Sequence, residues 1–114
     1  MDLNAIQLKI REFRDARDWM QFHNPKNLAI SVVLEATELL EHFQWKSPEE
    51  SEVHASQAKG ELADEAADIA VYLIEFCDNL GIDLEQAILS KLSKNAAKYP
   101  VEKAKGSAKK YTEL

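Results

Sequence analysis

The segment from Glu65 to Cys77 restricts the fold more than any other part of this sequence. It is apolar round most of a helix, which is typical of a helix buried on several sides. The same segment carries Glu65 and Asp68, and residues three apart lie on one face of a helix, one turn from each other. Because a buried carboxylate without a partner is strongly unfavourable, the pattern predicts that a cation neutralises this pair.

A second pair of carboxylates, Glu35 and Glu38, has the same three-residue spacing. Alone, this second pair is more typical of a solvated helix face. Facing Glu65 and Asp68, it would complete a cage of oxygen ligands, which suits Mg²⁺ or Mn²⁺. Glu41 continues the row by one turn and is a candidate further ligand or general base, although a surface charge explains it equally well.

Other catalytic and metal-binding patterns are not supported. A di-iron bundle uses Glu-x-x-His on two helices, and no such motif occurs here. His42 follows Glu41 directly, and His54 lies in a polar stretch where we assign it no role. Cysteine and histidine clusters of the zinc-binding kind are absent, as is a glycine-rich phosphate loop. Cys77, the only cysteine, is expected to be a buried, inert thiol.

Capping residues and apolar spacing predict an all-α domain of four or five helices. Asn24-Pro25 and Ser47-Pro48 are typical helix starts, and Gly81 is a typical stop. The expected helices cover residues 2–19, 25–45, 48–80 with a break near Gly60, and 84–99. We expect residues 1–100 to form the catalytic domain and residues 101–114 a lysine-rich tail.

The charge and hydropathy of the chain restrict its partners. Its 114 residues carry a formal net charge of -6, which argues against nonspecific binding to nucleic acid or to an anionic membrane. No segment is long and apolar enough to span a bilayer. The first residues show no basic start or apolar run of the secretory kind, so we expect a cytoplasmic protein.

Some aromatic and polar residues lie at positions where they could contact a flat ligand. These positions are the loop after the first helix, helix ends and the surroundings of the acidic pair. These candidates are Trp19, Phe22, His23, Asn27, Trp45 and Tyr72. Each aromatic ring could belong to the core, but rings in such places also stack on nucleobases. The side chains of His23 and Asn27 could form hydrogen bonds with a base edge.

The last expected helix carries a row of polar residues. Lys91, Asn95 and Lys98 share one face, with Lys94 beside them. Such a row is either a solvated basic face or a site that contacts phosphates.

Four blocks of sequence together resemble the MazG-like all-α nucleoside triphosphate pyrophosphohydrolases, and within them the dCTP pyrophosphatase branch. The blocks are Arg17–Leu28, Glu35–Trp45, Glu65–Leu73 and Lys91–Pro100. The resemblance covers nearly the whole chain, and its hallmark is Glu-x-x-Glu followed later by Glu-x-x-Asp. It implies cleavage between the α- and β-phosphates of a (deoxy)nucleoside triphosphate, giving the monophosphate and pyrophosphate.

The resemblance also implies roles for individual residues. The implied Mg²⁺ ligands are Glu35, Glu38, Glu65 and Asp68. The implied contacts with base and sugar are Trp19, His23, Trp45 and Tyr72, and those with phosphates or sugar are Lys91, Asn95, Lys98 and Tyr99. Glu38 and Glu41 are the candidates for the group that takes the proton of the attacking water. Two positions depart from the branch, Thr37 in place of a small Gly and the basic Lys94.

Relatives of this kind work as dimers or dimers of dimers with sites at subunit interfaces, so a homodimer or homotetramer is expected. The resemblance suggests a role in cleansing the nucleotide pool. Two alternatives stay open: a non-enzymatic helical oligomerisation module, and a related hydrolase of another nucleotide such as phosphoribosyl-ATP. The sequence leaves open the preferred base, the sugar and the number of metal ions.

Overall fold

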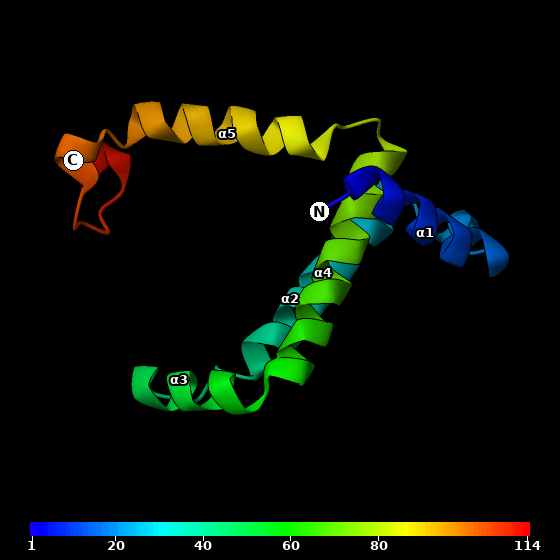
Figure 1. The fold of residues 1–114 in the computed structure, drawn as a ribbon, viewed down its shortest axis with the longest axis horizontal. Coiled ribbons are helices and arrows are strands. Elements are labelled where there is room, and N and C mark those ends of the chain that lie inside the picture. The colour runs from blue at the N-terminus through cyan, green and yellow to red at the C-terminus, as the bar shows by residue number, and fades with distance from the viewer. The chain divides into compact units, whose positions relative to one another are not determined.

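The computed structural model describes residues 1–114, which form helices and no strand, as expected of an all-α protein. The elements are α1 (Leu3–Ala16), the 3₁₀ helix η1 (Met20–Phe22), α2 (Pro25–Glu41), α3 (Pro48–Gln57), α4 (Lys59–Asn79), α5 (Leu84–Lys98), α6 (Val101–Ala104) and the 3₁₀ helix η2 (Tyr111–Glu113) (Figure 1). The chain divides into two compact units, residues 1–81 and residues 82–114, and each is described by itself. No helix combines the length and the apolar character that a membrane crossing requires.

The predicted helix starts are confirmed. The side chains of Asp2, Asn24, Ser47 and Asp83 each accept a hydrogen bond from the backbone N–H three residues further on, at distances of 2.9–3.1 Å. At α3 the Glu50 carboxylate also accepts from the backbone N–H of Ser47, at 2.9 Å, which completes a capping box. Local hydrogen bonds of this kind depend on neighbouring residues only, which explains why the sequence predicts them.

The helix ends differ more from expectation. α1 stops at Ala16 rather than near Trp19, and Asp18 just beyond it has a positive φ of 54° that turns the chain. α2 stops at Glu41, and residues 42–45 form turns instead of a last helical turn. The break between α3 and α4 falls at Ala58, so Gly60 lies in the first turn of α4. Gly81, with φ 68°, follows the end of α4 as predicted.

Within residues 1–81, α2 and α4 lie side by side, and α1 and α3 pack against α4 (Figure 1). The buried apolar side chains are Leu28, Ile74 and Cys77. Within the chain only Ile74, Glu75 and Cys77 of α4 are buried, so α4 is less buried than its sequence suggests. Many large apolar side chains remain exposed on α2 and after it, among them Val33, Leu34, Leu40 and Trp45.

Residues 82–114 form the second unit, in which the chain folds back on the end of α5. The rings of Tyr99 and Tyr111 meet edge to face with centroids 5.9 Å apart. The Nζ atom of Lys98 lies 4.9 Å from the centroid of Tyr111. The expected tail thus contains α6 and η2. A ring–ring contact and a cation–π contact hold η2 against the end of α5.

Candidate functional site

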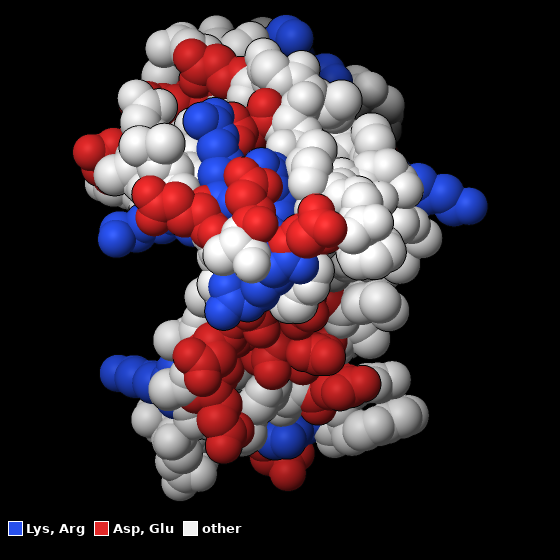
Figure 2. Space-filling view, turned by 90° about the vertical axis from the view of Figure 1, so that its right-hand side faces the viewer, with Lys and Arg blue, Asp and Glu red and all other residues white.

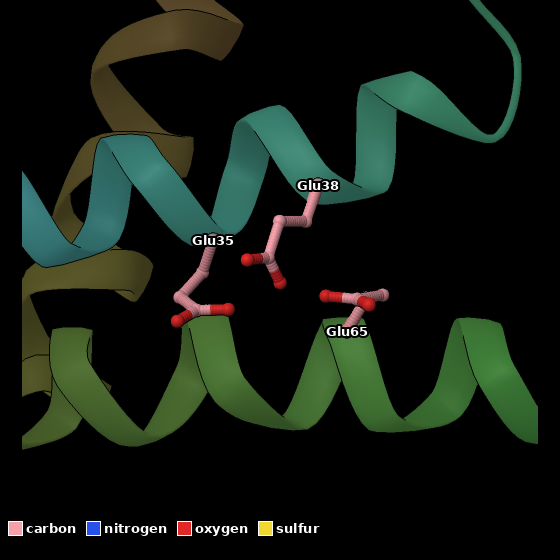
Figure 3. Close-up of side chains that lie close together, drawn as sticks. All are labelled: Glu35, Glu38 and Glu65. Atoms are coloured by element: carbon pink, nitrogen blue, oxygen red, sulfur yellow. The ribbon is translucent and has the colours of Figure 1, made fainter.

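Three carboxylates converge between α2 and α4. Glu35 and Glu38 point from α2 towards Glu65 on α4, as Figure 3 shows. One oxygen of each residue lies within 4.8 Å of one oxygen of each of the others. The spacing of three residues places Glu35 and Glu38 on the face of α2 that α4 covers. We call these three residues the acidic cluster.

The acidic cluster lacks the partners that buried carboxylates need. One oxygen of Glu35 and one of Glu65, in each case Oε2, are buried without a hydrogen-bond partner. Burial, followed by hydrogen bonding and repulsion with Glu38, raises the pKa of both carboxyl groups above the usual range. Unpartnered carboxylate oxygens from two helices fit a hard divalent cation, because such cations take several oxygen ligands. The chain therefore contains a candidate metal site.

Asp68, the fourth predicted ligand, lies outside this group of converging oxygens. Its charge nevertheless contributes to the raised pKa of Glu35, and its side chain lines a neighbouring cavity. Asp68 therefore lies near both the acidic cluster and that cavity.

Glu41 and His42 border the cluster on its other side. Together with Glu38 and Glu65 they line a surface depression. The sequence predicts no role for His54 on α3, and its Nε2 lies 2.9 Å from Nδ1 of His42. The spacing of four residues between Glu38 and His42 could have indicated that both share one side of α2.

A cavity of about 430 Å³ adjoins the cluster between α1, the loop around η1 and α4. Its size falls in the range of small-molecule sites, which is roughly 300–1,000 Å³. Its lining is mostly apolar, and consists of Ile6, Lys9, Ile10, Phe13, Arg14, Trp19, His23, Asp68, Val71, Tyr72 and Glu75. Three predicted nucleoside contacts, Trp19, His23 and Tyr72, are thus brought together.

The loop after α1 carries Trp19 and His23, and α4 carries Tyr72. The ring centroid of His23 lies 6.3 Å from that of Trp19 and 6.4 Å from that of Tyr72. Asn27 holds the loop from the start of α2, since its side chain donates a hydrogen bond to the carbonyl oxygen of Phe22 at 2.9 Å. The amide of Asn27 is therefore engaged with the backbone, and Asn27 does not line the cavity.

The remaining predicted contacts lie elsewhere. Trp45 follows α2, is 88% exposed and does not line the cavity. Lys91, Asn95 and Lys98 belong to α5 and Tyr99 directly follows it, so all four are part of residues 82–114.

Two buried charged residues in the cavity wall were not singled out from the sequence. Glu75 is 2% exposed and Arg14 is 8% exposed. A carboxylate in the apolar run of α4, seven residues after Asp68, was the available signal for Glu75. No comparable signal pointed to Arg14, which lies in a helix rich in exposed charges.

Charge is unevenly distributed around this site. Figure 2 shows acidic side chains gathered over the lower part of the face it presents. At that lower level Figure 1 has α3 and the adjoining ends of α2 and α4.

Comparison with known proteins places these features in a family. A sequence model of the MazG-like family matches residues 30–114. The chain belongs to the MazG-like family. Among curated proteins, this MazG-like chain is 44% identical to dCTP pyrophosphatase 1 of Rattus norvegicus, over 98% of this chain and 67% of the relative. It is 40% identical to dCTP pyrophosphatase 1 of Homo sapiens over the same shares.

A solved structure resembles the MazG-like chain closely as well. A pyrophosphatase from Archaeoglobus fulgidus superposes with a TM-score of 0.84 and 42% sequence identity, covering 88% of this chain and 94% of that protein. The all-α fold and the resemblance to dCTP pyrophosphatases expected from the sequence are thereby confirmed.

Proposed function

We propose that this protein is a metal-dependent nucleotide pyrophosphohydrolase that cleaves the α–β phosphoanhydride bond of deoxynucleoside triphosphates, dCTP among the better substrates. The observation that carries this proposal is the acidic cluster of Glu35, Glu38 and Glu65 beside an aromatic cavity of nucleoside size. The relatives named dCTP pyrophosphatase 1 and the pyrophosphatase neighbour support the same activity. The products are the nucleoside monophosphate and pyrophosphate, which suits a role in cleansing the nucleotide pool.

The acidic cluster supplies the metal ligands in this proposal. Glu35, Glu38 and Glu65 would hold Mg²⁺, with Mn²⁺ as a substitute, and Asp68 would be a further ligand. A bound Mg²⁺ neutralises triphosphate charge and lowers the pKa of water that it binds. Glu38 and Glu41, both exposed at the rim of the cluster, are the candidates to accept the proton of the attacking water.

The cavity receives the nucleoside. Trp19, His23 and Tyr72 bind base and sugar, and the triphosphate extends past Asp68 towards the acidic cluster. Asn27 contributes by fixing the loop that carries Trp19 and His23. Trp45 is exposed in the single chain and does not line the cavity. In this proposal it still contacts the base.

In this proposal, lysine side chains of α5 attract the negatively charged substrate. The substrate is strongly negative, and the protein itself carries a net charge of -6, so its few lysines matter for attraction. We assign Lys91, Asn95, Lys98 and Tyr99 to contacts with the phosphates or the sugar.

We also propose that the protein acts as a homodimer or a dimer of dimers. Three buried apolar residues make a small core, and exposed apolar side chains such as Val33, Leu34 and Leu40 on α2 need cover. A second copy of the chain would bury them.

A substrate screen tests the proposed activity. Each common dNTP and NTP, and phosphoribosyl-ATP, is incubated with the protein and Mg²⁺, and pyrophosphate release is measured. We expect the deoxynucleotides to be cleaved, dCTP among the best, with no turnover when a chelator removes the metal. Turnover of phosphoribosyl-ATP alone would indicate a different hydrolase, and no turnover with any nucleotide would leave a helical oligomerisation module.

A further inference from the structure

The carboxylate of Glu75 is separate from the acidic cluster and is buried in the cavity wall at 2% exposure. Both of its oxygens face Nδ1 of His23, at 2.9 Å for Oε1 and 2.8 Å for Oε2. A carboxylate buried to this degree needs donors on every side. The His23 ring is one of these donors.

Two more side chains complete the surroundings of Glu75. The amide nitrogen of Asn79 donates to Oε2 at 3.2 Å, and Nη1 of Arg14 lies 3.8 Å from the same oxygen. Arg14 is fixed in turn, because its guanidinium also donates to Oδ1 of Asn79 at 3.1 Å and to Asp15 at 2.8 Å. The orientation of the Asn79 amide follows from chemistry, since a guanidinium cannot accept and a carboxylate cannot donate.

This network decides which nitrogen of His23 carries the proton. Glu75 can only accept, so Nδ1 of His23 must donate. Arg14 is a second, positively charged neighbour of Glu75, with Nη1 3.8 Å from Oε2. In a neutral ring with a proton on Nδ1, the other nitrogen, Nε2, has a free lone pair. Nε2 of His23 has no hydrogen-bond partner within the protein, and the ring lines the cavity near Trp19 and Tyr72.

We propose that Glu75 is a positioning residue that holds His23 as the Nδ1–H tautomer, so that Nε2 accepts a hydrogen bond from an exocyclic amino group on the edge of the base. The inference rests on the proposed function for its ligand, a nucleotide in the cavity. The site then favours bases that present an exocyclic amino group to His23, of which cytosine is one. A base that lacks this group leaves the Nε2 lone pair without a partner.

The tautomer is measured first, without any substrate. The chain has three histidines, so ¹⁵N spectra of the imidazole rings at neutral pH contain three ring systems, and the variants His42→Gln and His54→Gln identify the His23 signals. We expect Nδ1 of His23 to be protonated and Nε2 to have the shift of an unprotonated ring nitrogen. A ring protonated on Nε2 would overturn the inference, whatever the activity of the protein.

Two variants of Glu75 then separate positioning from packing. Glu75→Gln keeps a carbonyl oxygen for Nδ1–H and should keep the tautomer. Glu75→Leu removes the acceptor, and the His23 ring should become a mixture of tautomers. An unchanged His23 spectrum in Glu75→Leu would contradict the proposal, and if that variant does not fold, the wild-type spectrum still decides.

Specificity is tested with dCTP and its analogue lacking the 4-amino group, the triphosphate of 2-pyrimidinone deoxyriboside. In the wild type we expect kcat/KM for dCTP to exceed that for the analogue by about 3–10-fold, the net worth of one hydrogen bond. Glu75→Gln should keep this ratio, and Glu75→Leu should bring it close to one. If an active wild-type enzyme had equal kcat/KM values for dCTP and the analogue, the inference would be overturned and the proposed function would still stand. Absence of any nucleotide hydrolysis would instead reject the proposed function, and the ¹⁵N spectra would remain informative.

Discussion

At the scale of single residues, the carboxyl groups of the acidic cluster determine how the metal-free protein responds to pH. Burial and the proximity of Glu38 raise the pKa of Glu35 and Glu65 above the ordinary value of 4.5. The folded state therefore holds protons on them at a pH where the unfolded chain has released its own. Their contribution to stability is complete below about pH 4.5 and is lost as the pH rises through the raised pKa values.

The variant Glu35→Gln removes one of these ionisations. Without metal, we expect its melting temperature to exceed that of the wild type at pH 7, by a margin that shrinks towards pH 4, because at low pH the wild-type cluster is protonated. Catalysis should fall by at least about 100-fold, since even the loss of a group that supports a metal ligand costs about 10–100-fold. Glu52→Gln, an exposed acid on α3, is the matched control and should leave both quantities unchanged. If the difference in melting temperature between Glu35→Gln and the wild type did not depend on pH, the ionisation of the acidic cluster would not be its cause.

Trp19 is the residue that distinguishes nucleoside binding from metal binding. Trp19→Ala should weaken binding of a non-hydrolysable nucleotide by about 1–3 kcal/mol, the usual worth of a base stacked on an aromatic ring. Titration calorimetry measures this binding, and the affinity for Mg²⁺ alone should not change. Phe22, a further candidate ring of the same loop, is exposed and does not line the cavity, so Phe22→Ala is the control. Equal losses in both variants would point to a general disturbance of the loop.

At the scale of secondary-structure elements, the register between α2 and α4 brings the acidic cluster together. Leu28, 1% exposed on α2, belongs to the core that holds these helices. Leu28→Ala should lower the free energy of unfolding by about 2–5 kcal/mol, the cost of a core cavity, and weaken metal binding as the register loosens. Ser47→Ala should lower stability by about 0.5–2 kcal/mol through loss of the α3 cap and leave metal affinity unchanged. Denaturant unfolding and metal titration measure both effects, and loss of metal affinity in Ser47→Ala alone would contradict this division.

Features that depend on residues close together in the sequence could be predicted, whereas features that depend on packing between elements could not. Caps such as Asp2 and Asp83 depend on residues three apart, and the pair of Glu35 with Glu38 depends on helix periodicity. Such local patterns were sufficient to predict the helices and most of the cluster. The place of Asp68 outside the converging oxygens depends on how α4 is rotated against α2. The contact between His23 and Glu75, 52 residues apart, depends on packing that no local pattern encodes.

At the scale of the whole molecule, the sequence of α4 implies more burial than the single chain supplies. Its apolar residues Val71 and Leu73 remain 38% and 39% exposed, and Leu40 and Trp45 are more exposed still. We expect light scattering on the eluting protein to give the mass of a dimer or tetramer at micromolar concentration. The mass of a monomer under these conditions would contradict the proposed dimer or tetramer.

The products formed from dCTP in ¹⁸O-labelled water test the central claim most directly. With Mg²⁺ we expect dCMP and pyrophosphate in equal amounts, one ¹⁸O atom per turnover in one of the two products, and no reaction in the presence of a chelator. Glu65→Gln should lose this reaction while Glu52→Gln keeps it. Release of orthophosphate and dCDP, or full activity in Glu65→Gln, would contradict the account.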